Sequence, residues 1–189
     1  MSPREELNEM LAQLNEEQAQ LVRTYIESLL RPRADATSNR WSFDFIEHFG
    51  EAKVSAQRDK NGMEVQVGEA TCDQVTRPAL WEHPPLTGAA IISYAVPIPP
   101  HLRALKLKFF IGIRDGSQLP NDRYVAFRVI VNGWKLWSAV KNSRGWDEYT
   151  VAMPELASDV ARIEFQTDGL GDHRWNWAVW GEPKLISDF

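Results

Sequence analysis

The sequence predicts a mainly β protein, an antiparallel β-sandwich preceded by an N-terminal amphipathic helix. Three observations lead to this prediction. Apolar residues recur every three or four positions before residue 32, and a polar stretch follows. From Trp41 onward, apolar and polar residues alternate in short runs divided by turn residues, with no helical pattern between them. We therefore expect a helical segment (1–31), a linker (32–40) and a β-sandwich domain (41–189).

The N-terminal helix is expected over residues 3–31. Pro3 suits the first turn, and Pro32 ends the pattern because the residue before a proline avoids the helical region. Asn15 and Gln18 have the spacing of an N-cap pair, so one helix of about 40 Å and two helices divided near residues 14–15 both remain open. An amphipathic helix alone in water is marginally stable, so its apolar stripe needs a partner surface. That surface is either the following domain or a second copy of the chain, which would make residues 3–31 a coiled-coil-like oligomerisation element or a tether.

The strands are expected where apolar residues alternate with polar ones. The clearest alternations cover residues 90–98, 105–113, 125–131 and 161–167, and weaker ones cover 63–67, 149–153 and 175–180. Asn132-Gly133 is expected to form a type I′ turn, with residues 134–137 as the returning arm of a hairpin.

Composition excludes several classes of function. The chain of 189 residues is 43% apolar, which is enough for a buried core, and no run of 18 apolar residues occurs to span a membrane. It has 21 basic and 26 acidic residues without a basic cluster, which argues against a nucleic-acid partner. Cys72 is the only cysteine, so an internal disulfide is excluded. No signal peptide is visible, which favours a cytoplasmic location.

The last third of the chain carries motifs that act as a unit. They are V-I-V-N-G at residues 129–133, F-Q-T-D-G at 165–169 and W-A-V-W-G-E-P-K-L at 177–185. This pattern resembles the galactose-binding-like jelly-roll superfamily, particularly carbohydrate-binding modules of the NPCBM type. Asn176 stands where those modules tend to have an aspartate before the first tryptophan.

The resemblance implies a non-catalytic module that binds glycans or mediates contacts, sometimes with a structural calcium ion. Calcium needs hard oxygen ligands, and Asp168, Asp172 and Glu182 are the candidates. No other cofactor is expected. No serine elbow, Gly-rich phosphate loop or zinc motif occurs, so we do not expect an enzyme.

The chain has eight tryptophans, and none precedes Trp41. Trp177 and Trp180 are expected inside the sandwich or under its loops. Trp134, Trp146 and Trp175 lie at turns or loop edges and are expected to be more exposed. A flat, amphipathic ring suits both a core and the apolar face of a sugar.

Two loops, residues 114–123 and 168–174, are longer than the fold requires and carry charged side chains. With the neighbouring tryptophans they supply the candidate ligand-binding residues Arg114, Asp115, Asp122, Trp146, Asp172, His173, Arg174 and Trp175. The leading hypothesis is recognition of a glycan or polyol by these loops. The alternative is a structural or interaction protein whose sandwich and helix are protein–protein assembly surfaces.

Overall fold

The computed structural model describes residues 11–15, 18–20, 22–23, 26, 40–56, 64–100, 102, 104–156 and 158–188. The chain separates into two units, Met1–Ser38 and Asn39–Phe189. Among the described residues, no helix has the length and apolar character needed to cross a membrane.

The N-terminal unit shows helical residues at 11–12, 18–20, 22–23 and 26, and Leu14 and Asn15 between them are not helical. The Asn15 N–H donates to Gln18 Oε1 over 3.1 Å, and the Gln18 N–H donates back to Asn15 Oδ1 over 2.9 Å. This reciprocal pair is a capping box, which starts a new helix. A single continuous helix over residues 3–31 is therefore wrong for this part of the chain. The other positions of that segment lie outside the described residues, and its role in oligomerisation stays a prediction.

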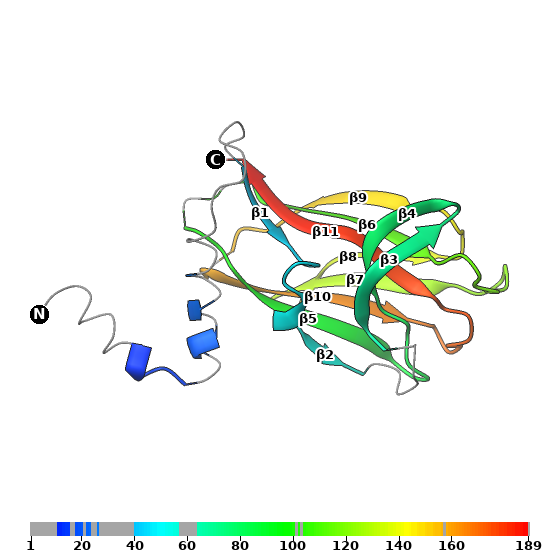
Figure 1. Cartoon of the computed structure of the whole chain (residues 1–189), viewed down its shortest axis with the longest axis horizontal. Helices are drawn as coiled ribbons and strands as arrows, with labels where there is room; N and C mark the ends of the chain where they lie inside the picture. Colours follow the sequence, from blue (N-terminus) through cyan, green and yellow to red (C-terminus); the bar gives the residue numbers. More distant parts are fainter. Residues whose placement is uncertain are drawn as a thin grey trace, which may run out of the picture. The chain divides into compact units, whose positions relative to one another are not determined.

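The second unit is a sandwich of two antiparallel sheets, as predicted (Figure 1). One sheet has the strand order β3 (Gln66–Cys72), β4 (Val75–Trp81), β11 (Ala178–Asp188), β6 (Lys106–Ile113) and β9 (Asp147–Ala152), and β1 (Arg40–Asp44) also pairs with β11. The other has the order β2 (Lys53–Ser55), β5 (Ala89–Pro97), β10 (Val160–Asp168), β7 (Val125–Val131) and β8 (Trp134–Lys141). A 3₁₀ turn, η1 (Phe49–Glu51), precedes β2.

The main core lies between the two sheets and is centred on Trp180 of β11, which is fully buried. Its ring makes edge contacts with Phe109, Phe127 and Phe165 at centroid distances of 5.4, 5.1 and 5.0 Å. These phenylalanines come from β6, β7 and β10, so one side chain joins both sheets. The prediction that Trp180 is part of the architecture is confirmed.

The expected turn at Asn132-Gly133 is confirmed, since both residues have positive φ angles, 49° and 84°. The closing strand begins later than predicted, at Ala178, because residues 175–177 belong to the preceding loop. Strands β1, β2 and β4 were not among the predicted strands.

The β3–β4 hairpin belongs to the first sheet, but its turn end folds over the outer face of that sheet, the face turned away from the main core. Cys72 of β3 lies so close to β6 that a Cβ on Gly112 would be 2.6 Å from its Sγ, although two strands separate β3 from β6 in the sheet. Ala70, Cys72, Ala79 and Val179 form a second small buried cluster between the hairpin and the sheet. Trp146 packs against this cluster from the loop before β9.

Candidate functional site

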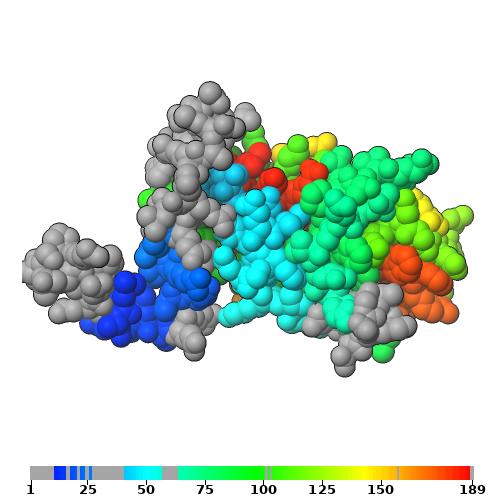
Figure 2. Space-filling view, in the orientation of Figure 1, coloured from blue at the N-terminus to red at the C-terminus, as the bar shows by residue number. Residues whose placement is uncertain are grey.

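Three loops meet at one end of the sandwich. They follow β4 (residues 82–88), β6 (114–124) and β10 (169–177). Ser117 Oγ donates to the Trp175 carbonyl over 2.6 Å, and the Arg123 guanidinium lies 3.9 Å from the Asp172 carboxylate. Figure 2 shows the orange surface of the β10–β11 loop beside the yellow-green surface of the β6–β7 loop. The two long loops singled out from the sequence are therefore neighbours in space.

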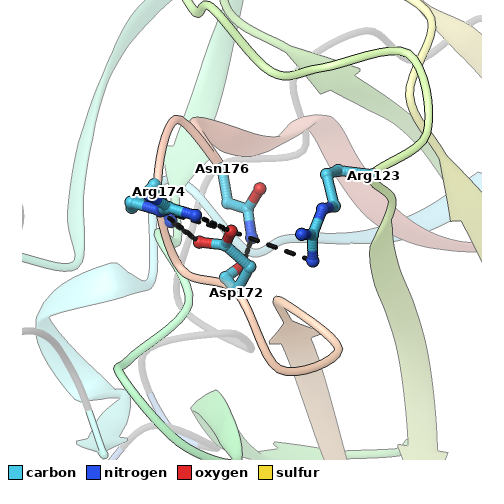
Figure 3. Close-up of polar contacts among 4 residues, drawn as sticks. All are labelled: Arg123, Asp172, Arg174 and Asn176. Atoms are coloured by element: carbon cyan, nitrogen blue, oxygen red, sulfur yellow. Dashed lines mark hydrogen bonds and ion pairs between the residues drawn. The ribbon is translucent and has the colours of Figure 1, made fainter.

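Asp172 and Arg174 form a directed ion pair in the β10–β11 loop (Figure 3). Arg174 Nε donates to Asp172 Oδ1 over 2.9 Å and Arg174 Nη2 donates to Oδ2 over 2.6 Å. The hydrogen bonds from Arg174 hold the pKa of the Asp172 carboxyl well below its usual value. The carboxylate thus stays charged, and its remaining lone pairs can accept hydroxyl groups.

Asn176 fixes the shape of this loop. Its side chain is buried, and its Nδ2 donates to the Asp172 backbone carbonyl. A carboxylate at this position could only accept hydrogen bonds, whereas the amide can donate one. The asparagine that departs from the family motif therefore makes a contact that an ionised aspartate would not make.

A hollow of about 200 Å³ lies between the β4–β5 and β10–β11 loops. Its lining consists of Pro85, Leu86, Thr87, Gly88, Asp168, Gly169, Gly171 and Asp172. Leu86 and the nearby Leu170 are among the exposed large apolar side chains. The hollow thus combines two carboxylates with an apolar rim.

Two tryptophan rings lie at the C-terminal end of the same loop. The Trp175 and Trp177 rings are 5.7 Å apart, and the Arg114 guanidinium lies 3.4 Å above the Trp81 ring and 5.6 Å from the Trp177 ring. Trp175 is 39% exposed and has a φ of 62°, a left-handed conformation that is unfavourable for a bulky residue. Such strain persists where the surroundings enforce it and is concentrated at functional sites.

Two of the candidate ligand-binding residues stabilise the fold instead. Asp115 accepts hydrogen bonds from the Asp73 and Gln74 N–H groups, and so holds the β3–β4 turn against the sheet. Trp146 is less exposed than predicted, because its ring covers the second cluster and its Nε1 donates to the Val75 carbonyl over 2.8 Å. Neither side chain stands at the loop end as a free binding group.

The remaining candidate residues, Asp122 and His173, lie in the loops of the candidate site. Asp122 is exposed in the β6–β7 loop, and His173 is half-buried beside Asp172. Trp134 is 81% exposed, as expected, but it lies in the β7–β8 hairpin at the opposite end of the sandwich.

The residues named for calcium do not fit a calcium site. Asp168 and Asp172 line the same hollow, but Glu182 lies elsewhere, paired with Arg77 at 3.2 Å. Asp168 and Asp172 also face arginines, Arg128 and Arg174. Within the described ranges, no group of three or more His, Cys, Asp or Glu side chains could hold a metal ion.

Sequence reasoning missed Trp81, Ser117 and Arg123 as site residues. Trp81 lies in β4, where Pro78 interrupts the alternation of apolar and polar residues. The sequence therefore did not show that the Trp81 side chain lies on the outer face of the sheet. Ser117 and Arg123 lie inside the long loop already singled out, but only the fold shows which loop they face.

The sequence matches no protein-family model, and no curated protein sequence matches it. Solved structures do match. A chain of tandem CBM51 modules from a family 98 glycoside hydrolase of Streptococcus pneumoniae aligns over 79% of this chain with a TM-score of 0.56 and 12% identity. This chain spans only 48% of that one.

Two further structures are single modules. CBM51 from a Clostridium perfringens GH95 protein, in complex with methyl-galactose, aligns over 77% of this chain and 99% of its own, with 12% identity and a TM-score of 0.49. A family 35 carbohydrate-binding module from Clostridium thermocellum aligns over 77% and 97%, with 12% identity and a TM-score of 0.47.

The class of fold follows from the first of these matches and from the strand order. The second unit has the β-sandwich of carbohydrate-binding modules, and the resemblance to the galactose-binding-like jelly roll is confirmed at the level of fold. At 12% identity the match establishes fold alone.

Proposed function

We propose that this protein is a non-catalytic module that binds a glycan or polyol at the loop end of its sandwich. The carrying observation is the exposed, strained Trp175 beside Trp177 on one flank of the β10–β11 loop, with the Asp172–Arg174 pair on the same loop. Flat aromatic rings suit the apolar face of a pyranose, and a charged Arg–Asp pair offers directed donors and acceptors for hydroxyl groups. The fold shared with carbohydrate-binding modules supports the same proposal.

The experiment is a glycan array probed with the intact protein, followed by titration calorimetry on the best ligands. Trp175→Ala and Arg174→Ala are expected to weaken binding at least tenfold, which is about 1.4 kcal/mol. Trp134→Ala is the matched control, because it removes a more exposed tryptophan from the opposite end and should leave binding unchanged. Failure to bind any glycan on the array would overturn the proposal. Hydrolysis of a bound glycoside would overturn the part of it that says the module is non-catalytic.

One observation favours the alternative assembly role. Strand β8 is at the edge of its sheet among the described strands, and it exposes Trp134 (81%) and Val140 (61%). Exposed apolar side chains on an edge strand are suited to pairing with another chain. Light scattering of the intact protein and of Trp134→Ser tests this role: a discrete oligomer that the substitution dissociates would support it.

A further inference from the structure

Among the residues that the structure describes, Arg114 is a partly buried cation without a carboxylate partner. Arg77 and Arg128 are the other partly buried arginines in the described chain, and they form ion pairs of 3.2 and 3.1 Å with Glu182 and Asp168. Arg114 has no ion pair within the described residues, and its contacts are the faces of two tryptophans. Of these three partly buried arginines, Arg114 is therefore the one without an ion pair among the described residues, and it lies at the end of the sandwich where the three loops meet.

The nearest carboxylate along the chain does not neutralise Arg114. Asp115 Oδ1 accepts the Asp73 N–H over 2.9 Å, and Oδ2 accepts the Gln74 N–H over 3.1 Å. Burial lowers the pKa of the Arg114 guanidinium, because it removes the charge from water. An arginine nevertheless keeps its charge at neutral pH, so the site holds a positive charge that no carboxylate of the described residues pairs with.

The two tryptophans leave a specific part of Arg114 available. The Trp81 ring covers a flat face of the guanidinium at 3.4 Å, so the N–H groups around its edge point away from that ring. This edge is a rigid fork of donors, and its geometry matches a carboxylate. Trp177 lies 5.6 Å from the guanidinium and 5.7 Å from the exposed Trp175, so the rings lead from the proposed sugar platform to the cation.

We propose that Arg114 receives a carboxylate of the ligand, so that the module selects acidic glycans, those that contain uronic acids, over neutral ones. This selectivity rests on the proposed glycan-binding function. A sugar carboxylate would supply the partner that Arg77 and Arg128 find within the protein. A neutral sugar would leave the guanidinium uncompensated and would gain only hydroxyl contacts.

The test uses sugar pairs that differ only in the carboxylate: methyl glucuronide against methyl glucoside, and methyl galacturonide against methyl galactoside. With the intact protein, calorimetry should give at least tenfold tighter binding of the acidic member in one pair. The Nε–Hε resonance of Arg114 should shift on titration with that sugar. Arg114→Gln should remove the preference while retaining the neutral sugar, and Arg114→Lys should keep part of it, because lysine has the charge without the fork.

Arg77→Gln is the matched control, since Arg77 also lies over an aromatic ring, Phe110 at 3.8 Å, but has its own carboxylate. It should leave the preference unchanged. Equal binding within both pairs, or tighter binding of the neutral sugars, overturns the selectivity and leaves the proposed function standing. Failure of all four sugars and of every glycan on the array overturns both. Should Arg114→Gln fail to fold, the comparison within each pair and the Arg114 resonance still decide.

Discussion

Glu82 is expected to make the stability of the sandwich depend on pH in one direction. Its side chain is fully buried, where Trp180 Nε1 donates to Oε2 over 2.7 Å, and Oε1 has no hydrogen-bond partner among the described residues. Burial raises the pKa of this carboxyl well above its ordinary value of 4.5, even though the Trp180 hydrogen bond favours the charged form. Below this raised pKa, the folded protein holds Glu82 as the neutral acid.

The consequence for unfolding has a defined size. Above pH 4.5 the unfolded chain has released this proton while the folded protein keeps it. The free energy of unfolding then falls by about 1.4 kcal/mol for each pH unit, until the pH passes the folded-state pKa of Glu82. Glu82→Gln has nearly the same shape, stays neutral at every pH and can still accept the Trp180 hydrogen bond, so it should abolish this contribution.

The assay is urea unfolding of the wild type and of Glu82→Gln at several pH values from 5 upward. The difference between their free energies should change by about 1.4 kcal/mol per pH unit in favour of the variant. Glu155→Gln, which removes an exposed carboxylate outside the strands, is the control and should track the wild type. Parallel pH profiles for the wild type and Glu82→Gln would refute the buried neutral acid.

Further predictions concern packing, the hairpin turn and metal. Gly112→Ala should lower stability by about 1–3 kcal/mol, because the new Cβ would lie 2.6 Å from Cys72 Sγ, whereas Gly50→Ala meets nothing within 4 Å and should not destabilise; urea midpoints compare them. Asp115→Ala should cost about 0.5–1.5 kcal/mol, because two hydrogen bonds to a carboxylate are lost while water can reach the exposed N–H groups, and faster amide exchange confined to the β3–β4 turn would locate the loss. Chelation of calcium should leave the melting temperature unchanged, and a fall would show that the folded protein binds an ion.

The alternation of apolar and polar residues correctly predicted several of the strands. Strands β5, β6, β7 and β10 have one face in the core, so alternation marks them to within a residue or so. Strand β4 escaped prediction because Pro78 interrupts it and because both of its faces carry apolar residues, Leu80 in the main core and Ala79 in the second cluster. A strand with apolar side chains on both faces has no alternation to detect.

The site was predictable as a pair of loops but not as a set of contacts. Charge and length identified residues 114–123 and 168–174, and these loops do meet. Their side chains then divide by partner: Asp115 turns to the β3–β4 hairpin, while Arg114 turns to Trp81. The two residues are adjacent in the sequence and both charged, so the sequence gave them the same apparent role, and only the fold shows that their partners differ.

The hairpin across the outer face also determines what Cys72 can report. Cys72 is fully buried on the inner side of this hairpin, and burial raises the pKa of its thiol to about 12. Because the thiolate is the reactive form, an alkylating reagent can modify Cys72 only after the hairpin has lifted. The chain has no other cysteine, so the gain of one label by the whole protein in a mass spectrum reports the opening of this element: its opening rate at high reagent concentration, where modification outpaces reclosing, and its opening equilibrium at low concentration. The protein therefore carries its own probe of local unfolding beside the candidate site.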